Sequence, residues 1–158
     1  MVTVGDTAPA FTAPLANGDV VEFSLSDRLD DAPLVLAFFL GAFPGVCTHE
    51  METFEERLDE FDELGATVYG VSVDTPFALD AFRDDAGLSF GLLGDTNRRA
   101  VAAFDVRMDL DSTGVENVAK RSVFVLDGDG VVRYAWVSDD PGIEPDYDEV
   151  VDAVSDLS

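Results

Sequence analysis

The sequence predicts an α/β fold with a central mixed β-sheet and helices on both faces. Two observations carry this prediction: strand patterns alternate with amphipathic helices, and a β-hairpin followed by a last helix closes the chain. Residues 33–40, PLVLAFFL, are a continuous apolar run, which is typical of a strand buried on both faces of a sheet. No repeat or linker interrupts the 158 residues, so residues 1–158 are predicted to be one domain.

The first half of the chain contains a hairpin and a long helix beside this strand. Residues 5–27 contain Pro, Gly and an Asn-Gly pair, and they predict loops with a short hairpin. Residues 48–65 predict an amphipathic helix that ends at Gly65, because apolar side chains recur at helical spacing between acids. These apolar positions are Met51, Phe54, Leu58 and Phe61.

The second half supplies further strands and helices. Residues 75–87 predict a helix, because Pro76 suits its first turn and Gly87 its C-terminal end. The other predicted elements are a strand over 66–74, a short helix over 98–106, a hairpin over 122–137 with its turn at 127–130, and an amphipathic helix over 147–157.

Charge excludes some partners. The chain has 33 acidic and 9 basic residues and a net charge of −24, a field that repels nucleic acid and anionic membranes. One interpretation is a solvated acidic coat for the salt-rich cytoplasm of a halophile, and the other is an acidic patch for a basic partner. The acids are dispersed along the whole chain, which favours the coat.

The single cysteine, Cys47, excludes a disulfide framework within the chain and a CxxC redox pair. The first residues lack the basic and apolar regions of a signal peptide, and no uncharged run is long enough to span a bilayer. We therefore expect a cytoplasmic protein with no membrane partner.

Metal motifs are weak. Residues 109–114, DLDSTG, begin like a calcium loop, but the twelfth position is Lys120, which would repel the ion. Residues 127–130, DGDG, suit a hairpin turn by backbone geometry alone. No Walker-type phosphate loop follows a strand. We predict no metal site and no bound cofactor.

Cys47 lies where a buried strand ends and a helix begins. The free amides and the dipole of a helix N-terminus stabilise an anion, so this position favours a reactive thiolate. A buried and inert cysteine is the alternative. His49 lies two residues later and on a helix points to nearly the opposite side, so a Cys–His catalytic pair is disfavoured and an exposed or capping histidine is expected.

Residues 36–51, LAFFLGAFPGVCTHEM, resemble the active-site segment of peroxiredoxins, which are thiol peroxidases with a thioredoxin-like fold. Residues 4–27, 65–82 and 119–137 resemble the other blocks of that family in the same order. Length and single cysteine resemble the one-cysteine branch near alkyl hydroperoxide reductase E and bacterioferritin comigratory protein. The resemblance implies that this fold extends over nearly the whole chain.

The resemblance also implies roles for three residues. Cys47 matches the peroxidatic cysteine, and Arg121 matches the arginine that holds the peroxide beside the thiolate. Glu50 matches the acid that positions this arginine. A guanidinium near the sulfur favours the thiolate and stabilises the charge that develops on the departing oxygen.

Two positions depart from the family pattern. Leu40 stands at a proline position, where it can still shield the cysteine from water. Pro44 stands at a Thr or Ser position and has neither a hydroxyl nor an N–H to donate to peroxide. The backbone amides of Val46 and Cys47 remain possible donors. We therefore expect a slowed peroxidase, or a relative that has left peroxide chemistry.

Three functions follow. The first is a peroxidase that forms a Cys47 sulfenic acid and needs an external thiol, such as a small thiol or a thioredoxin-like protein, but no metal or organic cofactor. The second is a redox sensor or thiol-exchange protein, and the third is a non-enzymatic interaction module. The resemblance also implies a homodimer, with the region of Pro76 and Phe77 at the contact and Phe43 nearby.

Overall fold

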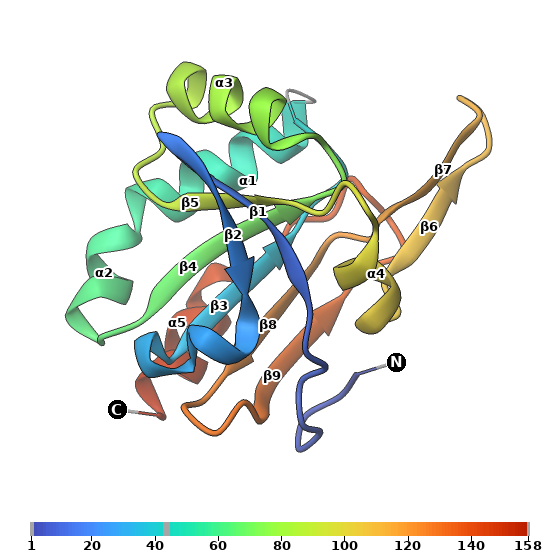
Figure 1. The fold of residues 1–158 in the computed structure, drawn as a ribbon. Coiled ribbons are helices and arrows are strands. Elements are labelled where there is room, and N and C mark those ends of the chain that lie inside the picture. Colours follow the sequence, from blue (N-terminus) through green and yellow to red (C-terminus); the bar gives the residue numbers. More distant parts are fainter. Residues whose placement is uncertain (1, 43–44, 158) are drawn as a thin grey trace.

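A seven-stranded mixed sheet runs through the protein in the order β2-β1-β5-β4-β3-β8-β9 (Figure 1). The computed structural model describes residues 2–42 and 45–157, without the side chain of Val46. The three central strands are parallel, and antiparallel hairpins extend the sheet at both ends. The strands are β1 Thr12–Asn17, β2 Asp19–Ser24, β3 Leu34–Phe38, β4 Thr67–Ser72, β5 Gly91–Gly94, β8 Ser122–Leu126 and β9 Val132–Val137.

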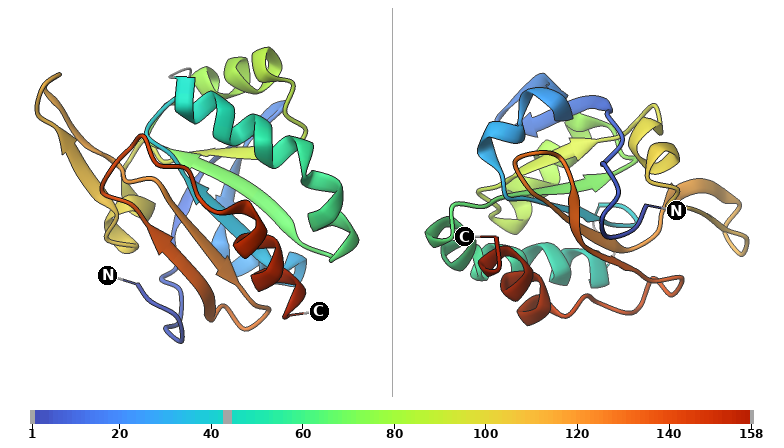
Figure 2. Two further views of the ribbon diagram at one scale, coloured as in Figure 1. Left: turned by 180° about the vertical axis from the view of Figure 1, so that it is seen from behind. Right: turned by 90° about the horizontal axis from the view of Figure 1, so that it is seen from below.

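Helices cover both faces of the sheet, as predicted, but unequally (Figure 2). One face packs against the helices α1 Gly45–Glu56, α2 Leu58–Glu63, α3 Pro76–Ala86 and α5 Tyr147–Ser155. The opposite face packs against α4 Arg99–Ala103 and the short 3₁₀ turns η1 Leu25–Asp27 and η2 Leu29–Asp31. Among the described residues, no helix is both long and apolar enough to cross a bilayer.

The central strand β3 explains why its sequence is apolar without interruption. Leu36 and Phe38 face the layer with α4, whereas Val35 and Ala37 face the layer with α1. All four side chains are fully buried. A strand buried on both faces needs apolar residues at every position, because alternate side chains enter different layers.

Most predicted elements are confirmed, with boundaries within a few residues, but the predicted helix over residues 48–65 is wrong in two ways. It begins at Gly45, so Cys47 already lies inside its first turn, and it breaks at Arg57, where φ is −100°. Phe54 and Phe61 on either side of the break are both fully buried against the same face of the sheet. The apolar periodicity therefore continues across the break, so the sequence pattern does not reveal that the helix is interrupted.

Three strands were not predicted. Strand β5 has only four residues and begins and ends with glycine, so it carries no alternating pattern. A Cβ atom on Gly94 would lie 2.9 Å from the carbonyl oxygen of Asp74, which explains a glycine at this strand end. Strands β6 Arg107–Leu110 and β7 Val115–Ala119 form a separate hairpin that projects from the sheet (Figure 1), and residues 109–114 include its turn.

Candidate active site

Cys47 lies in the first turn of α1, directly beyond the C-terminal end of β3. Its side chain is only 1% exposed and belongs to the apolar layer that contains Phe39 and Met51. Leu40 is partly buried and packs against the same layer. The backbone amides and the dipole of a helix N-terminus favour an anion at such a position.

Arg121 approaches the sulfur from the start of β8, the antiparallel neighbour of β3. It directly precedes β8, and β8 pairs with β3 so that Ser122 lies opposite Phe38. The Nη2 atom of Arg121 donates a hydrogen bond to the Sγ atom of Cys47 at 3.2 Å. Burial opposes the charge of Arg121, but Glu50 and Cys47 together raise its pKa, so the guanidinium remains cationic beside the sulfur.

Glu50 completes the buried cluster. It lies one helical turn after Cys47, and its Oε1 accepts a hydrogen bond from Nη1 of Arg121 at 2.5 Å. The other oxygen, Oε2, is buried and has no hydrogen-bond partner among the described residues. Burial raises the pKa of Glu50 to about 7, although the charge and the hydrogen bond of Arg121 act in the opposite direction.

A backbone carbonyl that sequence reasoning missed also holds Arg121. The carbonyl oxygen of Pro141 accepts hydrogen bonds from Nε at 3.1 Å and from Nη2 at 2.8 Å. The same Nη2 therefore contacts both the carbonyl and the sulfur. A backbone acceptor carries no residue-type signal, so no motif in the sequence could have identified it.

Asp74 holds the segment that precedes α1, and sequence reasoning missed this residue too. Its Oδ2 atom accepts hydrogen bonds from the backbone N–H of Ala42 at 2.8 Å and from the hydroxyl of Ser72 at 2.7 Å. Asp74 follows β4, the parallel neighbour of β3, so both loops leave the same edge of the sheet. An acid directly after a buried strand was the available signal.

Other predicted site residues have different positions. Phe43 and Pro44 lie outside the described residues, as does the side chain of Val46. The His49 side chain is 67% exposed, and its Nδ1 atom pairs with Oε1 of Glu144 at 2.7 Å. His49 therefore contacts the segment before α5.

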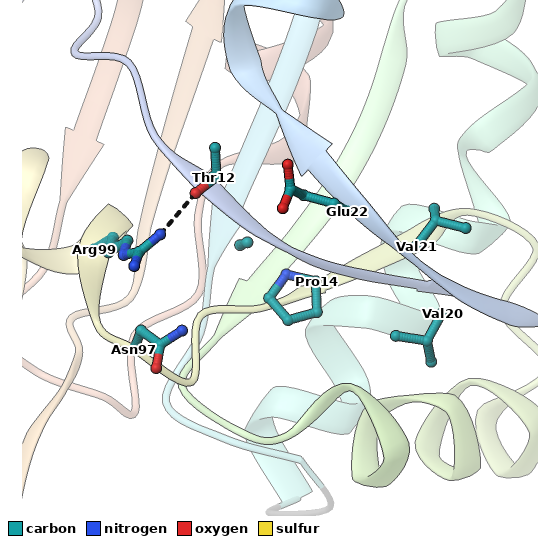
Figure 3. A pocket seen from close by; sticks show the side chains of 8 residues that line it. Thr12, Pro14, Val20, Val21, Glu22, Asn97 and Arg99 are labelled. Atoms are coloured by element: carbon teal, nitrogen blue, oxygen red, sulfur yellow. Dashed lines mark hydrogen bonds between the residues drawn. The ribbon is translucent and has the colours of Figure 1, made fainter.

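Figure 3 shows a separate pocket of about 250 Å³ beside the β1–β2 hairpin. Arg99 donates a hydrogen bond to the hydroxyl of Thr12 at 3.0 Å on its wall. Glu22 and Asn97 lie around the same hollow. None of the predicted site residues that the structure describes lines it, so we treat this pocket separately from the Cys47 cluster.

The cluster can hold a nucleophilic sulfur and stabilise an anion next to it. One cation contacts the sulfur, and a carboxylate and a carbonyl fix the orientation of that cation. Charge-assisted hydrogen bonds of this kind are stronger than neutral ones and keep their geometry where water is excluded. The arrangement suits attack by a thiolate on a substrate that releases negative charge.

Glu50→Gln should flatten the pH dependence of stability. With a folded pKa of about 7 and an ordinary value of 4.5, the folded protein binds more protons than the unfolded chain between these values. The free energy of unfolding of the wild type therefore falls as pH rises through this window. We expect a shallower slope in Glu50→Gln, measured by urea unfolding at several pH values. Glu52→Gln, an exposed acid on α1, is the control, and equal slopes in wild type and Glu50→Gln would contradict the prediction.

Comparison with known proteins places this cluster in a family. The sequence profile of the AhpC/TSA family matches residues 4–135. A Mycobacterium tuberculosis relative named as a peroxiredoxin is 38% identical over 136 residues, which cover 85% of this chain and 84% of the relative. Peroxiredoxin-2 of Pongo abelii is 35% identical over 146 residues, which cover 87% and 79% of the two chains.

Solved structures agree. The peroxidoxin BcpB of Mycobacterium tuberculosis superposes with a TM-score of 0.86 at 28% identity, covering 100% of this chain and 99% of that one. AhpC of Enterococcus faecalis has a TM-score of 0.86 at 24% identity and covers 99% and 92% of the chains, so it shows the shared fold. The predicted fold is thus confirmed, and the chain belongs to the AhpC/TSA family, as its resemblance to peroxiredoxins predicted.

Proposed function

We propose that Cys47 is the residue with which this chain reduces hydrogen peroxide or alkyl hydroperoxides. Membership of the AhpC/TSA family makes the chain a thiol-dependent peroxidase, and the roles of individual residues are our assignment. The hydrogen bond from Arg121 to Cys47 is the observation that carries it. It supports a thiolate held next to a fixed cation.

The proposed reaction begins when the thiolate attacks one peroxide oxygen. The S–O bond forms as the O–O bond breaks, so the sulfur is oxidised to a sulfenic acid and the peroxide is reduced. The leaving oxygen carries the electron pair and takes up a proton to become water or an alcohol. Arg121 stabilises the negative charge on this oxygen as it develops, and Glu50 and Pro141 hold the guanidinium in place.

The sulfenic acid must be reduced by a thiol from outside the chain, because the sequence contains only one cysteine. A first external thiol condenses with the sulfenic acid, releasing water and forming a mixed disulfide. A second thiol attacks this disulfide and returns Cys47 to the reduced state. We propose a small thiol or a thioredoxin-like protein as the reductant. These steps require no metal and no organic cofactor.

Arg121→Lys should slow oxidation of Cys47 by roughly 10²–10³-fold, since lysine cannot reproduce the forked contacts with the sulfur, the carboxylate and the carbonyl. The rate constant is measured by stopped-flow mixing with hydrogen peroxide and mass spectrometry. Cys47→Ser should consume no peroxide. Arg133→Lys is the matched control, because Arg133 on β9 is half-exposed and pairs with Asp127 in the turn after β8. Equal rates for both lysine variants, or an active Cys47→Ser, would refute the proposal.

Pro44→Thr should accelerate Cys47 oxidation, on the order of the 10²–10³-fold attributed to one preorganised donor. Pro44→Ala separates the two contributions, because it restores the N–H but not the hydroxyl. The same peroxide assay measures both variants. If neither variant is faster than the wild type, position 44 does not limit the reaction. A low rate in all three proteins would favour a thiol sensor or exchange function, which is the alternative that Pro44 motivates.

We also propose a homodimer whose contact includes Phe77, the second residue of α3. Its side chain is 74% exposed, a large apolar area for a single residue, and the family resemblance implies a contact in this region. Phe77→Glu should dissociate the dimer, measured by sedimentation velocity, because the introduced charge would be buried at the contact. Val21→Glu on β2 is the control. A wild-type protein that sediments as a 17.0 kDa monomer would contradict the proposal.

A cytoplasmic location and adaptation to high salt remain predictions from composition. The net charge of −24 supports the salt prediction, because concentrated salt screens repulsion between dispersed acids. Unfolding temperatures in dilute buffer and in concentrated potassium chloride would test the salt prediction, which requires a higher value in salt.

A further inference from the structure

The segment that supplies the Pro141 carbonyl joins β9 to α5 and comprises residues 138–146. We call it the arginine loop. Pro141 accepts two of the hydrogen bonds that orient Arg121, and one of them shares Nη2 with the bond to Cys47. The position of this loop therefore decides how the guanidinium meets the sulfur.

The middle of the arginine loop is mostly exposed to solvent. Asp139, Asp140, Gly142 and Ile143 are all exposed, so packing alone does not fix Pro141. At the start of the loop, the N–H of Ser138 donates to the carbonyl oxygen of Arg121 at 2.9 Å. The side chains that restrain the loop toward its other end are consequently important.

Glu144 provides one such restraint, beside the buried Pro145. Its Oε1 atom accepts a hydrogen bond from the hydroxyl of Tyr147 at 2.6 Å and lies 2.7 Å from Nδ1 of His49. Tyr147 is itself anchored, because its ring packs edge-on against Phe54 of α1 with the centroids 5.2 Å apart. Glu144 thus connects the arginine loop to α1, the helix that carries Cys47.

Helix α1 therefore contacts the arginine loop by two routes. Cys47 and Glu50 reach it from the buried side through Arg121 and Pro141. His49, between them in sequence, reaches it from the exposed side through Glu144. The ion pair of Asp139 with Lys120 and the turn around Asp140 also restrain the loop near Pro141. The contact through Glu144 adds a restraint that ties the far end of the loop to α1.

The ion pair between His49 and Glu144 depends on the charge of His49. Its hydrogen bond to Glu144 and the charge of Glu144 raise its pKa above the ordinary 6.5, and Glu56 and Glu52 on α1 act in the same direction. Burial opposes ionisation of Glu144, but the hydrogen bonds from Tyr147 and His49 outweigh it and lower its pKa. The ion pair is complete below the pKa of His49 and is lost as pH rises through that value.

We propose that Glu144 is a positioning residue for Arg121, and that its ion pair with His49 makes this positioning depend on pH. Glu144 also lies close enough to affect the buried pair directly, since its charge acts on both Glu50 and Arg121. The inference rests on the proposed role of Cys47 as the peroxidatic residue.

A double-mutant cycle in the second-order rate constant of Cys47 oxidation tests the proposal. At about pH 6, where the pair is charged, we expect Glu144→Gln and His49→Gln each to slow oxidation by roughly 10–100-fold, the cost of a misplaced catalytic group. The double variant should be no slower than either single variant, because both remove one contact. At about pH 9, where histidine is neutral, the difference between His49→Gln and wild type should nearly vanish.

Two further variants separate positioning from a general effect of surface charge. His49→Lys keeps a cation beside Glu144 at both pH values, so it should oxidise faster than the wild type at about pH 9. Asp148→Asn is the matched control, because the side chain of Asp148 on α5 forms an ion pair with Arg57 at the same 2.7 Å distance. Asp148 contacts the arginine loop through its backbone N–H, which donates to Oδ1 of Asp146 at 3.1 Å and is retained in the variant. Wild-type rates in Glu144→Gln and His49→Gln, or an equal loss in Asp148→Asn, would overturn the proposal.

A readout without peroxide distinguishes this inference from the proposed function. The side-chain Nε–H of Arg121 donates to Pro141, so its ¹⁵N NMR resonance and its exchange with solvent report the contact directly. We expect faster exchange in Glu144→Gln and unchanged exchange in Asp148→Asn. If the wild type reacts slowly but exchange still responds, only the peroxidase assignment fails. If oxidation is fast and exchange does not change, only the role of Glu144 fails.

Discussion

The hydrogen bond between Arg121 and Cys47 is the contact around which the site is arranged. A guanidinium that is 1% exposed must have its donors satisfied, because an unpaired buried cation is costly. Glu50 and Pro141 accept three hydrogen bonds from the guanidinium, and the sulfur of Cys47 accepts a fourth. The arrangement shows why the acid, the carbonyl and the thiol must lie together, since each limits where the planar guanidinium can point.

The sheet brings these groups together from distant parts of the chain. Cys47 follows β3 and Arg121 precedes β8, and the antiparallel pairing of these strands puts the two segments at one edge. The parallel pairing of β3 with β4 places Asp74 at the same edge, where it holds Ala42 ahead of α1. The apolar layers that define strand register therefore also determine the geometry of the polar cluster.

Sequence patterns predicted the elements that have strong periodicity and the residues that have distinctive chemistry. Strand β3, the β8–β9 hairpin and helix α5 were predicted because each shows an apolar pattern over several residues, and Cys47, Glu50 and Arg121 follow a motif. Strand β5 was not predicted, because four residues that begin and end with glycine show no alternation of apolar and polar side chains. Pro141 and Glu144 were not predicted. Pro141 acts through its backbone carbonyl and Glu144 through a tertiary contact, and neither leaves a pattern in the local sequence.

Cys47 and Arg121 lie 74 positions apart in the sequence, so their contact can form only when distant segments of the chain come together. Until β8 pairs with β3, the hydrogen bond from Arg121 to Cys47 cannot form. The contact between the cation and the sulfur thus depends on long-range order in the sheet. Any change that separates β8 from β3 would therefore also remove the cation from the sulfur.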